Sequence, residues 1–268
     1  MPANQVNEAT KLDTKRLTAP QIFEAAKKNA RDELDRSVRT LAFSGLAGGL
    51  AMGLTGLSVA AMRSILGTGS WEELVSFLVY PMGFIVVIIG RAQLFTENTL
   101  YPVVLVLDEP RKIRQNTTKM LRLWAVVFVA NVCGALLFAL LAIRSAALSP
   151  EIASELVNLG VQAVAHPTAH IFWSGVIGGW LIALVAWLVT ASQWTIGQLV
   201  MVWLLAFVVG VGKFAHCIAT SGEILSAIMA GAASPGSYAH WLLFATLGNI
   251  AGGVVIVSLL NYGQVAGD

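Results

Sequence analysis

Six apolar stretches alternate along the chain with short polar segments, and each is long enough to cross a lipid bilayer as a helix. A hydrocarbon core about 30 Å thick requires about 20 consecutive, mostly apolar residues. The pattern therefore predicts an all-α, polytopic membrane protein with six transmembrane helices. The expected spans are residues 40–62, 74–107, 120–143, 168–190, 194–231 and 239–261.

The second and fifth of these spans are too long for a simple membrane helix, and both contain a polar interruption. The first interruption begins at Gly90 and Arg91, and the second begins at Gly212 and Lys213. Irregular backbone is tolerated inside a membrane where it is buried in protein or lines a cavity. We therefore predict that helices two and five are broken.

The two halves of the chain resemble each other, which predicts an internal repeat. Asn131-x-x-Gly134 in the third span parallels Asn249-x-x-Gly252 in the sixth, and each half has one Gly-basic interruption. Each unit has three spans, an odd number, so the two units must be inverted. Inverted repeats with interrupted helices commonly form a site at the bilayer midplane. Chance similarity in a chain with 25 glycines is the alternative.

The polar segment before the first span contains an amphipathic pattern. Thr18 and Pro20 are a helix-start signal, and the pattern is typical of a helix that lies on the membrane surface. A solvated tail helix is the alternative. The apolar positions at helical spacing are Phe23, Ala26, Ala30, Leu34 and Val38, opposite Lys27, Lys28, Arg31, Asp35 and Arg39.

The basic residues predict the orientation of the chain and its organisation. Most of the 17 Lys and Arg residues precede the first span or lie between spans two and three, and such residues stay on the cytoplasmic side. With six spans, both termini are then cytoplasmic. The expected units are a cytoplasmic segment with the amphipathic helix (1–39), a six-helix membrane domain (40–262) and a cytoplasmic tail (263–268).

Composition agrees with a membrane protein and excludes several other classes. The chain is 56% hydrophobic and 12% charged, with a mean hydropathy of +0.73. A formal net charge of +2 excludes binding to nucleic acid through phosphate contacts. The absence of GxSxG, HExxH and phosphate-loop motifs argues against an enzyme. The two cysteines lie in apolar stretches, and we expect neither a metal site nor a cofactor.

His216 is the strongest candidate for chemistry, because it lies in the middle of an apolar stretch beside a helix break. An ionisable group in such a place usually faces a partner or a cavity, and a histidine can exchange a proton near neutral pH. A neutral, hydrogen-bonded core histidine is the alternative. Thr96 in the other break is expected to hydrogen-bond to a neighbouring imidazole.

Four charged residues accompany these candidates near the breaks. An unpaired charge in the membrane centre is costly, and two acids with two bases sum to zero. We therefore predict a salt-bridge network that braces the broken helices. In the alternative, the lysine is a free pore charge. The four residues are Arg91, Glu97, Lys213 and Glu223.

Residues 94–99 (LFTENT), with residues 214–219 (FAHCIA) in the matching half, resemble the formate/nitrite transporter family. The similarity extends over most of residues 20–261 and includes the broken helices and the basic loop after span two. The resemblance implies a homopentamer of aquaporin-like protomers in the bacterial inner (plasma) membrane. Each protomer would have its own pore for small monovalent anions such as formate, nitrite or hydrosulfide. The glycine-rich first span permits the close helix approach of an oligomer.

The resemblance also implies roles for individual residues. In this family the threonine of the turn and the histidine of the fifth span meet at the pore centre, which corresponds to Thr96 and His216 here. Apolar constrictions lie on either side of that centre. The residues that the resemblance implies for the constrictions are Tyr80, Phe84, Leu94 and Phe95.

The sequence also departs from the family pattern. No basic residue occurs from 145 to 212, where the family usually has a lysine before span four, Gly179 replaces a usual asparagine, and Glu97 replaces a small hydroxyl residue. Our hypothesis is a channel or proton-linked transporter for a small monovalent anion, to which His216 donates a proton. One alternative is the same fold passing a small neutral or cationic solute, and another is a non-transporting membrane scaffold or sensor.

Overall fold

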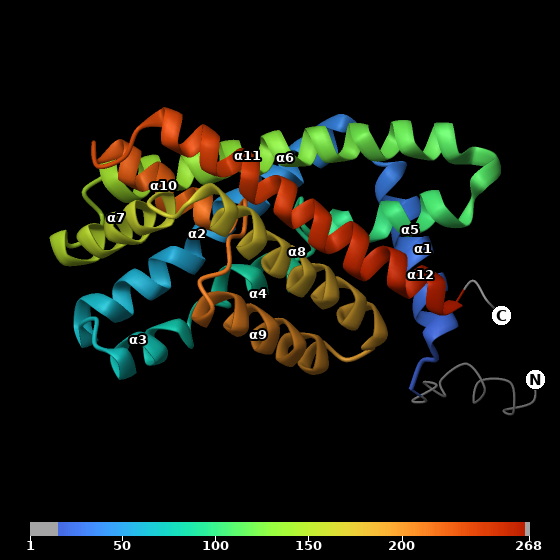
Figure 1. Cartoon of the computed structure of the whole chain (residues 1–268), viewed down its shortest axis with the longest axis horizontal. Coiled ribbons are helices and arrows are strands. Elements are labelled where there is room, and N and C mark those ends of the chain that lie inside the picture. The colour runs from blue at the N-terminus through green and yellow to red at the C-terminus, as the bar shows by residue number, and fades with distance from the viewer. Residues whose placement is uncertain (1–15, 266–268) are drawn as a thin grey trace, which may run out of the picture.

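The long helices of the protein run along one common direction, with their connecting loops at the two ends (Figure 1). The computed structural model describes residues 16–265, which are helical with short connections; the outer parts of the predicted terminal segments, 1–15 and 266–268, lie outside the described residues. The first half comprises α1 (Ala19–Leu34), α2 (Val38–Leu66), α3 (Ser70–Phe77), α4 (Met82–Ile89), η1 (Glu97–Thr99), α5 (Tyr101–Asp108), η2 (Pro110–Lys112) and α6 (Ile113–Arg144). The second half comprises α7 (Pro150–Val164), α8 (Thr168–Ala191), α9 (Thr195–Val211), α10 (Ala219–Met229), α11 (Pro235–Ala251), η3 (Gly252–Leu259) and α12 (Leu260–Val265).

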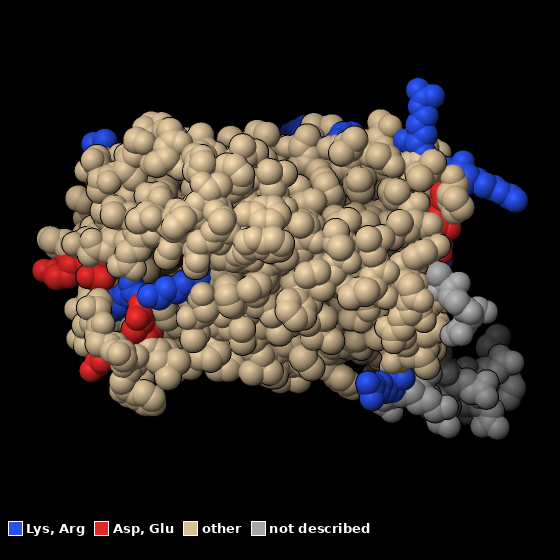
Figure 2. Space-filling view, viewed as in Figure 1, with Lys and Arg blue, Asp and Glu red and all other residues tan. Residues whose placement is uncertain are grey.

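The apolar spans expected from the sequence are present as helices. A broad uncharged band covers the middle of the face in Figure 2, and charged side chains lie mainly toward its two ends. The fifth predicted span is divided between α9 and α10, and the second continues from α3 and α4 into α5. Five helical segments are long and apolar enough to cross a membrane: Val38–Leu66, Ser70–Ile89, Pro110–Arg144, Thr168–Ala191 and Pro235–Val265.

Both helix breaks are built in the same way, as a helix end that closes on a basic residue. Arg91 follows α4 with a φ of 59°, and Lys213 follows α9 with a φ of 50°. At each end the next amide donates back to the carbonyl five residues earlier, from Ala92 to Val87 and from Phe214 to Val209, at 3.0 Å in both cases. This is the Schellman arrangement, which usually has glycine at the left-handed position.

Asn131 of α6 stabilises the extended chain after the first break. Its Oδ1 accepts a hydrogen bond from the Phe95 amide at 2.9 Å. Its Nδ2 donates to the carbonyl of Gln93 at 2.9 Å and to that of Gly45 in α2 at 2.7 Å. One buried amide thus satisfies backbone groups that the broken helix leaves without helical partners.

Asn249 of α11 makes the same three contacts in the second half. It accepts from the Cys217 amide at 2.8 Å and donates to the carbonyls of Ala215 at 2.9 Å and Gly175 at 2.8 Å. The second span runs from left to right in Figure 1 and the fifth from right to left, as inversion requires. The shared contacts make Leu94 the counterpart of His216.

The glycines of the first span have a different role from the one expected. Gly45 faces Ala130 of α6, and Gly49 lies so close to the Asn131 backbone that a Cβ atom would clash. Gly179 packs in the same way against the backbone of Asn249. These glycines therefore allow close helix packing within one protomer, so they are not evidence for a contact between protomers.

Helix α1 packs on the protein rather than lying free on a membrane surface. Thr18 caps it, with the side chain of Gln21 closing the capping box, and its buried face contacts α5, α8 and α12. Val38, assigned to this face from the sequence, is instead the first residue of α2 and is exposed. A new helix start at Ser37 separates Val38 from the α1 pattern.

Ion pairs join α1 to the following helices at the end of the molecule that contains α12 and the start of α6. Lys27, expected on the polar face, is buried and pairs with Asp108 at 2.7 Å. Arg31 pairs with Glu109 at 2.9 Å. An isolated exposed pair contributes little, but these pairs add to an apolar contact.

The Glu109 contact predicts a pH-dependent loosening of α1. Hydrogen bonds from Arg31 and Asn116 lower the pKa of Glu109 to about 2. A carboxyl group whose pKa is lowered in the folded state stabilises it above the unfolded pKa of about 4.3, and loses that effect as the pH falls toward 2. We expect α1 amides to exchange hydrogen faster in Glu109→Gln than in the wild type at neutral pH, and the difference to disappear near pH 2. Equal exchange at neutral pH would contradict this.

Candidate functional site

Thr96 and His216 lie in contact where the two breaks meet. Thr96 Oγ1 and His216 Nε2 are 2.7 Å apart, and both residues are fully buried. The other ring nitrogen of His216, Nδ1, accepts a hydrogen bond from the Ala219 amide at 3.0 Å. The contact that the sequence predicted is therefore present, and it joins the two halves of the protein.

The hydrogen bonds of His216 assign its proton. Because Nδ1 accepts from an amide, it has no proton, and the neutral imidazole has its single proton on Nε2. Nε2 then donates to Thr96, whose own hydroxyl proton is free to point elsewhere. A second proton, on Nδ1, would point at the Ala219 N–H and repel it. The hydrogen bonds therefore favour a neutral His216 that donates a hydrogen bond over an imidazolium that donates a proton.

A file of aromatic rings leads to the histidine from one side. Tyr80 and Phe84 have ring centroids 5.9 Å apart, and Phe84 meets the His216 ring edge-on at 5.0 Å. Phe84 and Leu94 have no exposed surface, and Tyr80 is 6% exposed. Phe84 thus covers one edge of the His216 ring with apolar surface, and the role of all three residues as constrictions stays a prediction.

Phe95 lies elsewhere. Its ring packs edge-on against Trp124 at 5.8 Å and Phe128 at 5.0 Å, both in α6. These contacts turn the Phe95 ring toward α6. The implied place of Phe95 at a constriction is therefore not supported.

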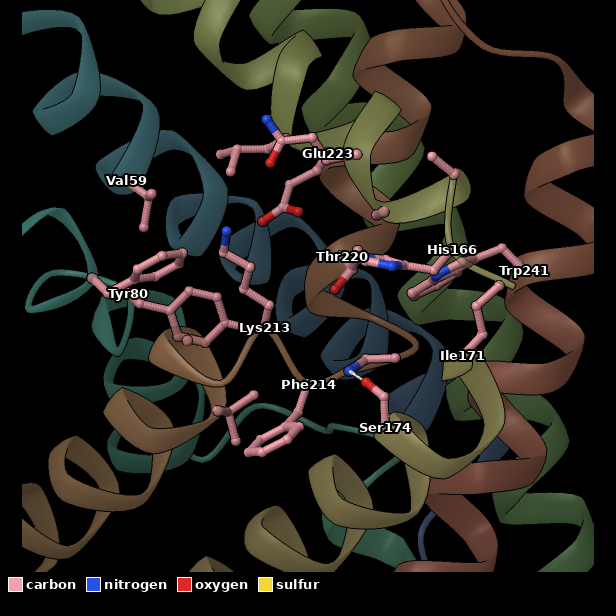
Figure 3. A pocket seen from close by; sticks show the side chains of 18 of the residues that line it. Val59, Tyr80, His166, Ile171, Ser174, Lys213, Phe214, Thr220, Glu223 and Trp241 are labelled. Atoms are coloured by element: carbon pink, nitrogen blue, oxygen red, sulfur yellow. Dashed lines mark hydrogen bonds between the residues drawn. The ribbon is translucent and has the colours of Figure 1, made fainter. Parts of the chain in front are cut away.

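A cavity of about 360 Å³, here called the entrance cavity, lies on the α3–α7 side of His216. Ala215 and Thr220, which flank the histidine, line its floor, and Tyr80 lines its wall. Figure 3 shows Lys213 and Glu223 pointing into it. Its remaining polar lining residues are Arg63, Gln162, His166, His170 and Ser174.

The predicted salt-bridge network is wrong. Lys213 pairs with Glu73 of α3 at 2.9 Å, and Arg63 of α2 pairs with the same carboxylate oxygen. Among the described residues, Glu97 and Glu223 form no ion pair, and neither does the exposed Arg91. In inverted halves, the charges after the first break and those after the second lie toward opposite ends of the molecule.

Four functional candidates were missed by the sequence interpretation. Arg63 and Glu73 lie at the ends of predicted spans, where charges are ordinary, so only the fold reveals them. His166 and His170 are stacked with centroids 4.3 Å apart on the cavity wall; their i, i+4 spacing was the available signal. Within the described part of the chain, no cluster of three His, Cys, Asp or Glu residues is suited to a metal ion.

Comparisons with known proteins identify the family that the chain is similar to. The sequence model described as formate/nitrite transporter matches residues 20–263. The chain is 30% identical to "Inner membrane protein YfdC" of Escherichia coli K12 over 93% of this chain and 80% of that protein. It is 28% identical to "Probable formate transporter" of Methanothermobacter thermautotrophicus over 71% of this chain and 74% of that protein. A solved "Pentameric formate channel with formate bound" superposes with a TM-score of 0.70 at 18% identity, over 90% of this chain and 99% of that one.

Proposed function

Because the chain belongs to the formate/nitrite transporter family, we propose that each protomer forms a pore for the anion of a small weak acid, with formate and nitrite as the first candidates. The names of a formate-transporter relative and of a formate-bound channel of the same fold support this choice. A transport role also explains why a buried Thr96–His216 contact occurs in a sequence that contains none of the enzyme motifs named above.

The observation that supports the proposal most is the buried Thr96–His216 contact next to the entrance cavity. An anion must shed water to pass the apolar surface of Phe84 and Leu94, which strongly disfavours a bare charge. A neutral acid pays a smaller desolvation cost, and the Thr96 hydroxyl offers it a hydrogen bond. The solute would thus cross the centre as a neutral acid.

Flux measurements test this function. We expect proteoliposomes containing the protein to take up formate or nitrite well above the rate of empty liposomes, faster as the external pH falls. Methylammonium tests the alternative of a cationic solute, which the buried Glu223 carboxyl at the cavity favours. Uptake of methylammonium without formate or nitrite would overturn our proposal, and no uptake of any of the three would favour a scaffold or sensor.

We further propose a homopentamer in the bacterial inner membrane, with both termini cytoplasmic. Helices α1 and α12 lie at the same end of the molecule (Figure 1), next to the basic residues of η2 and α6, which supports one shared side. Large apolar side chains such as Phe43, Val129 and Trp173 are exposed on the protomer, where lipid or neighbouring protomers would cover them. Native mass spectrometry is expected to give five protomers; a stable monomer or trimer would count against it.

A further inference from the structure

Glu223 is a carboxyl group that the Thr96–His216 contact does not use. It lies in the second turn of α10, is 8% exposed and lines the entrance cavity. Two glycines make room for it: a Cβ atom on Gly56 would lie 2.6 Å from Glu223 Cγ, and one on Gly160 would clash with the Glu223 carbonyl. The packing thus admits a carboxyl group at this position.

Within the described residues, the Glu223 carboxyl has no ion-pair partner, although cations are near. Arg63 and Lys213 line the same cavity, but both bind the Glu73 carboxylate. An unpaired charge that is nine-tenths buried is unfavourable, and a proton on Glu223 removes that charge. The cavity gives the carboxyl a route to solution from which to take the proton.

The protonation of Glu223 also sets the charge of the cavity. Two cations share one carboxylate in the Arg63–Glu73–Lys213 cluster, which leaves one excess positive charge. Ionised Glu223 cancels that excess, whereas protonated Glu223 leaves it in place. The Lys213 side chain, 48% exposed, is the accessible member of the cluster.

We propose that Glu223 is the proton-exchange group of the entrance cavity, and that its protonated form admits one weak-acid anion beside Lys213 and then gives that anion its proton. The O–H bond of Glu223 breaks, an O–H bond forms on the anion, and the neutral acid moves toward Phe84 and His216. The Glu223 carboxylate then takes a proton from the solution. This inference rests on the proposed function and supplies the proton that neutral His216 withholds.

Other titratable groups also face the cavity. They are Arg63 of α2, Tyr80 between α3 and α4, Lys213, and the His166–His170 pair at the start of α8; Tyr238 of α11 bonds to Ser221. Burial lowers the pKa of His166, and His170 and Lys213 lower it further, which disfavours a proton on His166. Among the described residues that line the cavity, Glu223 is the single carboxyl group.

The test compares formate uptake and lumenal acidification in proteoliposomes containing the wild type, Glu223→Gln, Glu223→Asp and Lys213→Met. Glu223→Gln should lower uptake at least tenfold and flatten its pH profile, and Glu223→Asp should retain a pH profile with a shifted midpoint. Lys213→Met should raise the KM for formate several-fold but keep the pH profile. Glu155→Gln, an acid of α7 outside the cavity, should match the wild type.

Two outcomes would overturn the proposal. One is that Glu223→Gln transports formate with the same rate and pH profile as Glu155→Gln. If the glutamine variant fails to assemble, the same comparison is made with Glu223→Asp. The other comes from infrared spectroscopy of the intact oligomer, where we expect the wild type to show a protonated-carboxyl band that Glu223→Gln lacks. Identical spectra of the two proteins would exclude Glu223 as the group that carries the proton. If the wild type moves no formate, the proposed function fails, and the infrared result still decides the role of Glu223.

Discussion

Replacing Asn131 by leucine is expected to cause a large fall in the melting temperature of the protein. The variant keeps the approximate side-chain volume but removes three hydrogen bonds, to the Phe95 amide and to the carbonyls of Gln93 and Gly45. A buried polar group left without a partner costs about 1–3 kcal/mol. The combined cost of several such groups is a large part of the free energy of unfolding of a typical domain.

Thermal unfolding of the purified oligomer in detergent measures this effect, and the chain offers two comparisons. Asn249→Leu removes the equivalent contacts in the second half and should lower the melting temperature by a similar amount. Asn158→Leu, on the exposed surface of α7, should change it little. If Asn131→Leu melted like Asn158→Leu, Asn131 would not be what holds the broken helix together.

The sequence predicted the membrane architecture because the length of an apolar stretch depends on local composition alone. Span positions, the two breaks and the repeat could all be read from apolar length and from the matched glycine, basic and asparagine residues. The resemblance additionally implied that Thr96 meets His216, which lies 120 positions away. That contact is set by the way the two halves join, and no local pattern reveals it.

The charge pairing could not be predicted, because it depends on where inversion places each break. The charges of two bases and two acids sum to zero, but this sum does not determine which of them lie close enough to pair. The four residues are Arg91, Glu97, Lys213 and Glu223. Lys213 finds its partner in α3, a segment whose acids looked like ordinary surface residues. Phe95 illustrates the same limit, since the direction of its ring follows from packing against Trp124 and Phe128 of α6.

The largest functional effect is expected at the centre of the pore. Thr96→Val preserves the shape of the side chain but removes the hydroxyl that bonds to His216 Nε2. His216→Phe replaces one ring by another of similar size. We expect Thr96→Val to reduce formate flux at least tenfold, and His216→Phe to reduce it further, while both variants retain the wild-type oligomer in native mass spectrometry.

A double variant tests whether the two residues act as a unit. If the Thr96 hydroxyl contributes by accepting a hydrogen bond from Nε2–H and donating one to the solute, the double variant should transport no worse than His216→Phe alone. The chain contains a matched control, because Thr168 and His240 form an exposed Thr–His hydrogen bond of 2.9 Å. Thr168→Val should leave flux unchanged. Independent, multiplicative losses from Thr96→Val and His216→Phe would instead mean that each residue acts separately, and that their buried hydrogen bond only supports the fold.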